Sequence, residues 1–284
     1  MSGYADPHAR VGFSAIFTFD RLAGHVVEIL RILALEKSVD DILVYCRESR
    51  CDLPFPTWSG GNKICEPIER EKSRPLSLIA ARNALAATSQ SDYLLFVDER
   101  SLPEPGFADA LASEISEQER DVALFPACRR RPPSHFSPPD DFLLVKGLGL
   151  RKDGFLAEWL RRDEKNPYEA DMDECVYPLA CTIAIKAAHF RALRGFDAHF
   201  THSSVEEFCL AAATSGIKPK ESRRAFCDIT DAKPMKTPLS ERKKMFLKHF
   251  DGFYRSGVID LGVAWMRVRQ CFGRAHARGD YVGR

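Results

Sequence analysis

Apolar and polar residues alternate in blocks along the first half of the chain, and the blocks have the lengths of strands and helices. Short apolar runs with β-branched or aromatic residues predict buried strands; they occupy residues 13–19, 41–46, 93–97 and 122–127. Helical periodicity or Ala-rich composition predicts helices between them; these segments are residues 21–37, 76–88 and 106–115. Such alternation is typical of β-α-β units, so we predict an α/β fold with a mostly parallel sheet.

The second half of the chain is less regular. Residues 128–141 combine three arginines with four prolines, which predicts an irregular segment. Such a segment is typically a surface loop, although its basic start could instead face an anionic ligand. Ser204 and Glu207 have the spacing of a helix capping box, and Gly216 is expected to end that helix. The elements expected here are helices at 154–165, 187–193 and 204–215, a strand at 181–185 and an acidic loop at 169–174.

The C-terminal residues differ in character from the rest of the chain. Two helices with apolar stripes and several Arg and Lys residues are expected at 239–250 and 258–272. We therefore expect a main domain over residues 1–238 and a basic helical segment over residues 239–284. Two interpretations stay open for this segment: its helices pack on the main domain, or their basic face contacts an anionic membrane surface.

Composition and charge exclude several classes of protein. The 284-residue chain is 45% hydrophobic, which is enough for a buried core. Its 41 Lys and Arg against 40 Asp and Glu argue against nucleic acid as a partner. The sequence has neither an uncharged apolar run of about 18 residues, which a transmembrane helix needs, nor an N-terminal signal pattern. Its nine cysteines form no C-x-x-C pair, so we expect reduced thiols in a cytoplasmic protein.

Residues that could bind a charged ligand follow the predicted strands. The carboxyl ends of neighbouring parallel strands meet at one edge of a sheet, where ligands bind. Carboxylates at such an edge suit Mg²⁺ or Mn²⁺ that bridges to phosphates, but they also cap helices, and both roles stay open at this point. The residues expected at this edge are Thr18, Phe19, Asp20, Cys46, Asp98, Glu99 and Arg100, with Arg82 and Asn83 on the preceding helix.

The order of these pieces resembles that of family 2 glycosyltransferases, which have the GT-A fold. Their opening strand and turn match FSAIFTFDR at residues 13–21. Their Ala-Arg-Asn, helix, strand and acidic turn followed by Pro match residues 81–107, and their Gly-Phe-Asp and acidic pair that opens a helix match part of residues 181–218. The resemblance covers about residues 11 to 220. It implies a GT-A-like fold with a mostly parallel, mixed central sheet flanked by helices and a helical C-terminal appendage.

The resemblance also implies a reaction. Family members of this kind move a sugar from a nucleotide-diphosphate sugar to an acceptor hydroxyl with inversion. By motif position Glu207 corresponds to the general base that takes the hydroxyl proton, with Glu206 as its neighbour. The nucleotide-sugar-binding residues would be Thr18, Phe19, Asp20, Cys46, Arg82, Asn83, Asp98 and Arg100.

The acidic turn departs from the family pattern. Asp98 and Glu99 stand where the family binds a divalent ion, Mn²⁺ or Mg²⁺, but the third position is Arg100 instead of a carboxylate. Three interpretations stay open. Arg100 neutralises the diphosphate in a metal-independent enzyme; Asp98 and Glu99 hold the ion while Arg100 points away; or the chain is an inactive GT-A-like scaffold or regulatory protein that binds a nucleotide or a partner. Cys46 replaces the family's usual Asp at the base-recognition position.

The resemblance suggests a biological setting. Enzymes of this size and family usually act in the assembly of surface polysaccharide or glycoconjugates, so the expected acceptor is a carbohydrate or a glycolipid. The expected location is the cytoplasm, with peripheral contact to the inner face of the membrane through the basic C-terminal helices.

Overall fold

The chain folds around a single mixed sheet. The computed structural model describes residues 11–48, 64–65, 75–118, 121–130, 143–150, 156–160, 176–177, 182–229, 240–241, 244–245 and 247–249. Its helices are α1 (Gly24–Leu35), α2 (Leu78–Thr88), α3 (Phe107–Ser116), α4 (Ala187–Ala192) and α5 (Ser204–Thr214). Its strands are β1 (Phe13–Phe19), β2 (Val39–Cys46), β3 (Ile64–Cys65), β4 (Tyr93–Asp98), β5 (Ser101–Pro103), β6 (Val122–Arg130), β7 (Leu143–Leu150), β8 (Leu156–Leu160), β9 (Val176–Tyr177), β10 (Ile183–Lys186) and β11 (Lys218–Ile229).

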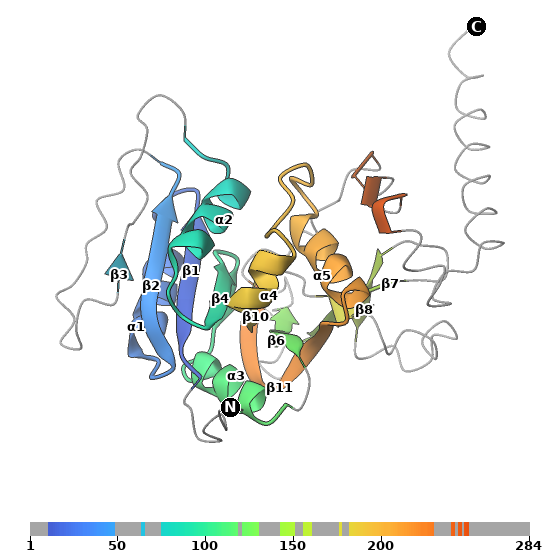
Figure 1. Ribbon diagram of the computed structural model, residues 1–284. Helices are drawn as coiled ribbons and strands as arrows, with labels where there is room; N and C mark the ends of the chain where they lie inside the picture. The colour runs from blue at the N-terminus through green and yellow to red at the C-terminus, as the bar shows by residue number, and fades with distance from the viewer. Residues whose placement is uncertain are drawn as a thin grey trace, which may run out of the picture.

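The order of the strands brings the ends of the first ones together. Within the described residues the sheet has eleven strands, eight of them in the order β3-β2-β1-β4-β10-β6-β11-β5, while β7 branches from β6 and pairs with β8 and β9 (Figure 1). β1 lies between β2 and β4 and is parallel to both. β10 is antiparallel to both β4 and β6, so β6 runs in the same direction as β1. The carboxyl ends of β1, β2 and β4 therefore share one edge.

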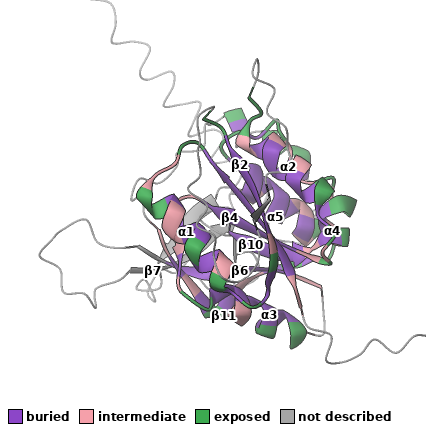
Figure 2. Cartoon of the chain, turned by 90° about the vertical axis from the view of Figure 1, so that its left-hand side faces the viewer, coloured by how far each residue is buried: buried purple, intermediate pink, exposed green. Residues whose placement is uncertain are grey.

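Helices cover both faces of the sheet. One apolar cluster joins the sheet to α2, α4 and α5, and it includes Phe96, Phe190, Phe196 and Phe208. The other joins the opposite face to α1 and α3. Figure 2 shows the buried strands between α1 on one side and α2 and α4 on the other. This arrangement agrees with the predicted α/β fold and with the continuous apolar strands, because a strand covered on both faces has no solvated side.

Local sequence explains where the helices begin. α2 starts after Ser77, whose hydroxyl accepts a hydrogen bond from the N–H of Ala80 at 3.2 Å. α3 starts after Gly106, which has a φ of 87° that disfavours most other residues. The buried Glu36 carboxylate accepts the Gly106 and Asp109 N–H groups, so the end of α1 caps the start of α3. Gly216, with a φ of 85°, follows α5 as predicted.

Three predictions of local structure are wrong. The segment expected to be a helix at 154–165 contains the strand β8, which pairs with β7, so long-range pairing overrides local helical preference. The first residues of the expected 128–141 loop belong to β6, where Cys128 pairs with Val145. Ser204 does not cap α5: the N-cap residue is Ser203, and no side chain caps that end. The expected 169–174 loop and 258–272 helix lie outside the described residues.

The described residues of the C-terminal segment pack on the rest of the described chain. These residues, 240–241, 244–245 and 247–249, are helical. Met245 is buried in the same apolar cluster as α5. This agrees with the interpretation in which the predicted 239–250 helix packs on the main domain. The division at residue 238 stays a prediction. Among the helices of the described residues, none combines the length and apolarity needed to cross a membrane.

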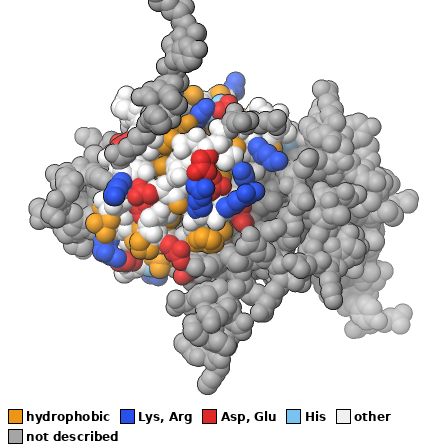
Figure 3. Space-filling view, turned by 90° about the horizontal axis from the view of Figure 1, so that it is seen from below, with side chains coloured by type: hydrophobic (Ala, Val, Ile, Leu, Met, Phe, Trp, Pro, Cys, Tyr) orange, Lys and Arg blue, Asp and Glu red, His pale blue; other side chains and the backbone are white. Residues whose placement is uncertain are grey.

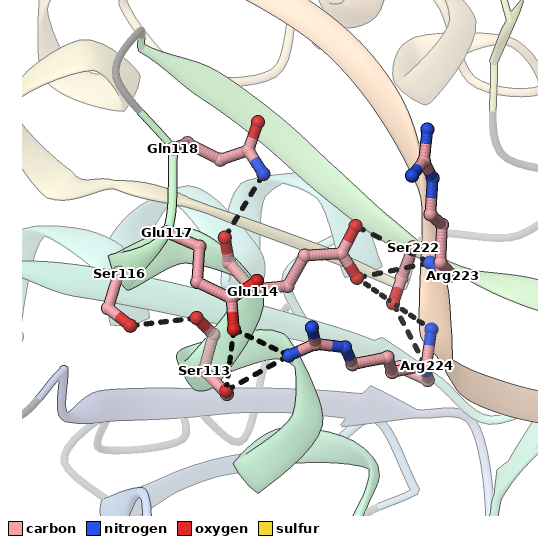
Figure 4. Close-up of polar contacts among 9 residues, drawn as sticks. Ser113, Glu114, Ser116, Glu117, Gln118, Ser222, Arg223 and Arg224 are labelled. Carbon is pink, nitrogen blue, oxygen red and sulfur yellow. Dashed lines mark hydrogen bonds and ion pairs between the residues drawn. The ribbon is translucent and has the colours of Figure 1, made fainter.

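Charged side chains of both signs lie next to one another on the side of the molecule where α3 lies (Figure 3). There the end of α3 is joined to β11, whose pairing with β6 is interrupted between Glu221 and Phe226. The buried Glu114 carboxylate accepts the Ser222 hydroxyl at 2.7 Å and the Arg223 N–H at 3.0 Å (Figure 4). Glu114 thus supplies the hydrogen bonds that the bulged strand does not obtain from its neighbour.

Candidate active site

Four of the predicted strand-end residues, Thr18, Phe19, Cys46 and Asp98, are brought into register at the carboxyl ends of β1, β2 and β4. In the parallel register Thr18 of β1 lies opposite Tyr45 of β2 on one side and Asp98 of β4 on the other. The next residue, Phe19, lies opposite Cys46. The expectation that separate strand ends would converge is confirmed by this register, which follows from the β-α-β connections of the first half of the chain.

Asp98 is the centre of the charge cluster at this edge. Its side chain is buried, and its Oδ1 accepts hydrogen bonds from Arg100 Nε at 2.8 Å and from the Arg100 backbone N–H at 3.0 Å. Its Oδ2 accepts from Arg100 Nη2 at 3.1 Å and lies 3.5 Å from Arg82 Nη2. Burial opposes ionisation, but the charges of Arg100 and Arg82 outweigh it and hold the pKa of Asp98 far below its ordinary value.

Arg82 ties α2 to this cluster. It is buried, and its Nε donates to the Thr18 hydroxyl at 3.0 Å while its Nη2 approaches Asp98. The Asp98 N–H donates to the hydroxyl of Thr182, just before β10, at 3.2 Å. Thr182 is a residue of the cluster that the sequence did not single out, because nothing in its local sequence marks a residue that enters the site from an antiparallel strand.

Arg100 does not point away from Asp98. Its guanidinium makes two hydrogen bonds to that carboxylate, and its side chain retains 26% exposure, against 9% for Arg82. In this structure Arg100 is therefore paired with Asp98 and is not turned outward. Of the two arginines in the cluster, Arg100 is the one that a ligand at the edge could reach.

Glu99 is oriented toward β1. Its Oε2 accepts the N–H of Asp20 at 3.1 Å, so it holds the chain just beyond the end of β1. Partial burial, together with the nearby Asp98 and Asp20 carboxylates, raises the pKa of Glu99 above its ordinary value. The exposed Asp20 carboxylate in turn lies 3.4 Å from Arg47 Nη1.

The acidic turn does not fit a divalent ion in this arrangement. Both oxygens of Asp98 already accept guanidinium N–H groups, and Glu99 is bonded to a backbone amide. Across the described ranges, no three His, Cys, Asp or Glu side chains are grouped as ligands of one ion. Hard divalent cations need several oxygen ligands, and a guanidinium supplies only donors.

Phe19 and Cys46 lie beneath the edge instead of lining it with their side chains. Phe19 is fully buried and packs on Phe17, with 5.1 Å between ring centroids. Its carbonyl accepts the Arg47 N–H at 3.0 Å. Cys46 is also fully buried, and its Sγ lies 3.6 Å from the Glu48 carbonyl oxygen. These two residues can shape the site through the backbone.

Asn83 connects α2 with the loop before α5. Its amide donates to the Phe196 carbonyl at 2.8 Å and accepts the Phe196 N–H at 2.9 Å. The preceding Gly195 has a φ of 71°, and a Cβ there would lie 2.6 Å from Asn83 Oδ1. Asn83 therefore holds two parts of the structure together, and the glycine is needed for that close approach.

Glu207 occupies the first turn of α5 together with Glu206. Glu207 is buried, whereas Glu206 is partly exposed. The Glu207 Oε1 lies 2.8 Å from His249 Nε2 and 2.7 Å from Lys248 Nζ. Both partners come from the C-terminal segment, and the sequence did not single them out because 41 or more residues separate them from Glu207.

Lys248 links two carboxylates. Its Nζ donates to Asp197 Oδ2 at 2.8 Å as well as approaching Glu207, and it lies 5.4 Å from the centre of the Phe200 ring. Partial burial opposes its charge, but the hydrogen bonds to Asp197 and Glu207 outweigh that effect and raise the pKa of Lys248. The ammonium group therefore stays charged at neutral pH.

Solved structures with the same architecture are glycosyltransferases. GalNAc-T7, crystallised with UDP, GalNAc and Mn²⁺, aligns with a TM-score of 0.60 and 14% identity over 84% of this chain. The 1–349 fragment of S. aureus TarS aligns with a TM-score of 0.54 and 13% identity over 86% of this chain and 72% of its own. The same fragment in complex with UDP-GlcNAc gives a TM-score of 0.51 at 12% identity, over 86% of this chain and 73% of its own.

These similarities show the fold. The chain has a GT-A-like α/β architecture with a mixed central sheet flanked by helices. It spans 48% of the length of the GalNAc-T7 chain. The sequence itself matches no protein-family description and no curated protein.

Proposed function

We propose that this protein is an inverting glycosyltransferase that moves a sugar from a nucleotide-diphosphate sugar to an acceptor hydroxyl. The observation that supports it most is the cluster of Arg82, Asp98 and Arg100 at the carboxyl edge of a GT-A-like sheet, in register with Thr18. Two guanidinium groups around one carboxylate at such an edge suit a diphosphate. The ligands named in the TarS and GalNAc-T7 structures, UDP-GlcNAc and UDP, point to a uridine nucleotide as the first donor to test.

In the proposed reaction Arg100 takes the electrostatic role at the diphosphate. As the bond between the sugar carbon and the diphosphate oxygen breaks, negative charge grows on the leaving group, and a fixed cation stabilises that charge. Arg100 is partly exposed and permanently charged, and the Asp98 carboxylate fixes its orientation. On the opposite face of the sugar the acceptor hydroxyl attacks, and Glu207 takes its proton.

The resemblance to family 2 glycosyltransferases supports the remaining parts of the proposal, which concern the acceptor, the process and the location. The acceptor is a carbohydrate or glycolipid, and the process is the assembly of surface polysaccharide or glycoconjugates. The same proposal places the enzyme in the cytoplasm or at the inner face of the membrane.

Nucleotide binding provides the first test. UDP at a concentration about 100 times its Kd should stabilise the native state by about 2.7 kcal/mol, because it binds the folded chain only. In a chain of this size the melting temperature should then rise by several degrees, about 2–4 °C per kcal/mol. Arg100→Ala should lose most of this rise, whereas Arg31→Ala, which removes an exposed arginine on α1, should keep it. No response to UDP, GDP or their sugars would contradict the proposal.

Metal dependence is tested with the same assay. The UDP-induced shift of the wild type should be equal in EDTA and in Mn²⁺, since Arg100 and not an ion meets the diphosphate. Arg100→Asp places a carboxylate at the third position of the acidic turn. That variant should bind UDP weakly in EDTA and regain binding with Mn²⁺. A wild-type shift that appears only with Mn²⁺ would leave the transferase proposal standing and remove the role of Arg100.

A further inference from the structure

The described helical residues of the C-terminal segment, 240–241, 244–245 and 247–249, are attached at one end to the loop that leads into α5. The Glu241 carboxylate accepts the Thr201 hydroxyl at 2.8 Å, the Ser203 hydroxyl at 2.8 Å and the His202 N–H at 3.1 Å. Met245, one turn further, is buried in the core. Glu241 and Met245 thus hold the segment against the loop before α5 and against the core, a few residues before Lys248.

At its other end the segment supplies two side chains, Lys248 and His249, that contact the Glu207 carboxylate. Lys248 Nζ and His249 Nε2 both lie against Oε1, at 2.7 and 2.8 Å. None of the described residues forms a hydrogen bond with Oε2. A carboxylate that is only 2% exposed requires partners that compensate its desolvation, and here a lysine and a histidine meet that requirement on one oxygen.

Lys248 is itself fixed in place. Asp197 accepts its second hydrogen bond, and Asp197 also accepts the His199 N–H at 2.9 Å and lies 2.8 Å from His199 Nδ1. The ammonium is therefore held between two carboxylates of the main domain, one in the loop before α5 and one on α5. This bridge restricts the side-chain rotamers of Glu207, and it also keeps a positive charge next to the Glu207 carboxylate.

We propose that Lys248 and His249 are positioning residues for Glu207, so that the C-terminal segment completes the acceptor half of the active site. This inference rests on the proposed glycosyltransferase function. Lys248 and His249 hold Oε1, and Oε2 receives the proton of the acceptor hydroxyl while the hydroxyl oxygen bonds to the sugar carbon and the nucleoside diphosphate leaves. In this step the proton goes to Glu207 and to neither Lys248 nor His249.

The test compares variants of the full chain in the release of UDP from UDP-GlcNAc and UDP-GalNAc, with water as the acceptor. Lys248→Met should lower kcat about tenfold to a hundredfold, less than Glu207→Gln, which removes the base and should cost about 10²–10⁴. The Kd for UDP should change less than about twofold, because Lys248 belongs to the acceptor half. Lys244→Met provides a matched control, since Lys244 is an exposed lysine of the same segment and should leave kcat unchanged.

Rescue separates positioning from a merely structural role. Lys248→Arg keeps a cation between Asp197 and Glu207 and should restore most of kcat. An unchanged kcat in Lys248→Met would overturn the inference. The inference would also be overturned if Lys248→Met lowered kcat together with the melting temperature and Lys248→Arg did not restore kcat. A wild type that binds UDP yet releases none from either donor would contradict a base held ready at Glu207, whereas a wild type that binds no nucleotide would remove the proposed function as well.

Discussion

Asp98 illustrates how a single buried charge can organise a site. Its two oxygens accept three hydrogen bonds from Arg100, and Arg82 approaches one of them. Arg82 also reaches Thr18 on the neighbouring strand. The carboxylate therefore connects β1, α2 and β4 at the point where the diphosphate is proposed to bind.

Removing the charge of Asp98 should be costly. Asp98→Asn leaves two guanidinium groups without their counter-charge, and breaking such a buried pair typically costs about 3–5 kcal/mol. Asp121→Asn offers a matched control, since Asp121 pairs with Lys186 while both side chains stay more than 40% exposed, and that change should stay within about 1 kcal/mol. Urea unfolding of both variants would measure the difference. Equal, small losses would mean that Asp98 contributes little to the fold.

The residues of the proposed donor site could be predicted from the sequence because they lie at the ends of strands that run in parallel. Thr18, Cys46 and Asp98 each lie at or near the end of an apolar run, and parallel pairing then brings these three strand ends together. Lys248 and His249 could not be predicted in this way. Their contact with Glu207 depends on how a distant helical segment packs, and neither residue belongs to a local pattern that indicates such a contact.

At the scale of elements, the first half of the fold follows its local patterns closely. The boundaries of α2 and β4 differ from the predicted ones by at most two residues, because each block has one periodicity and a clear end. β8 was missed because LAEWL is compatible with either state, and only its pairing with β7 decides for a strand. The bulge in β11 could not be predicted from local sequence either. The side chain that accepts a hydrogen bond from the bulge, Glu114, lies on α3, more than 100 residues away in the chain.

The link between α3 and β11 should be measurable. Glu114→Ala removes the acceptor of the Ser222 hydroxyl and the Arg223 N–H, and it leaves these partly or fully buried donors unsatisfied. The expected loss of unfolding free energy is about 1–3 kcal/mol. Glu117→Ala, one turn away, removes an exposed ion pair with Arg224 and a long, exposed hydrogen bond from Ser113, and it should have no measurable effect on denaturant unfolding. An unchanged unfolding free energy in Glu114→Ala would show that the Ser222 hydroxyl and the Arg223 N–H find other acceptors.

At the scale of the whole molecule, several carboxylates make stability depend on pH. Burial opposes ionisation of Asp197 and Glu241, but hydrogen bonds outweigh it and lower the pKa of both groups: Asp197 is bonded by Lys248 and His199, and Glu241 by Thr201 and Ser203. Asp98 has a lowered pKa for the reasons given above. Glu36 behaves oppositely, since its burial outweighs the amides of Gly106 and Asp109 and raises its pKa.

The signs of these shifts predict acid unfolding. A carboxylate with a lowered pKa in the folded state contributes its stability above its ordinary pKa, near pH 4, and loses it as the pH falls further. Glu36 has a raised pKa in the folded state, so its protonation stabilises the folded state as the pH falls toward its ordinary pKa. This gain should offset part of any loss of stability above about pH 4. The melting temperature should therefore change little between pH 7 and pH 5 and drop steeply below about pH 4. Asp98→Asn should show a shallower drop, and a wild-type curve that is flat down to pH 3 would contradict this assignment.

The hydrogen bonds between Asn83 and Phe196 affect which substitutions the protein can tolerate. They join the helix that carries Arg82 to the loop that leads into α5, so one amide side chain connects the proposed donor site to the proposed acceptor site. A bulkier residue at position 195 would push against that amide. In a collection of random variants, damage at either position should weaken nucleotide affinity and turnover together, whereas damage elsewhere in one of the two sites should impair only one of them.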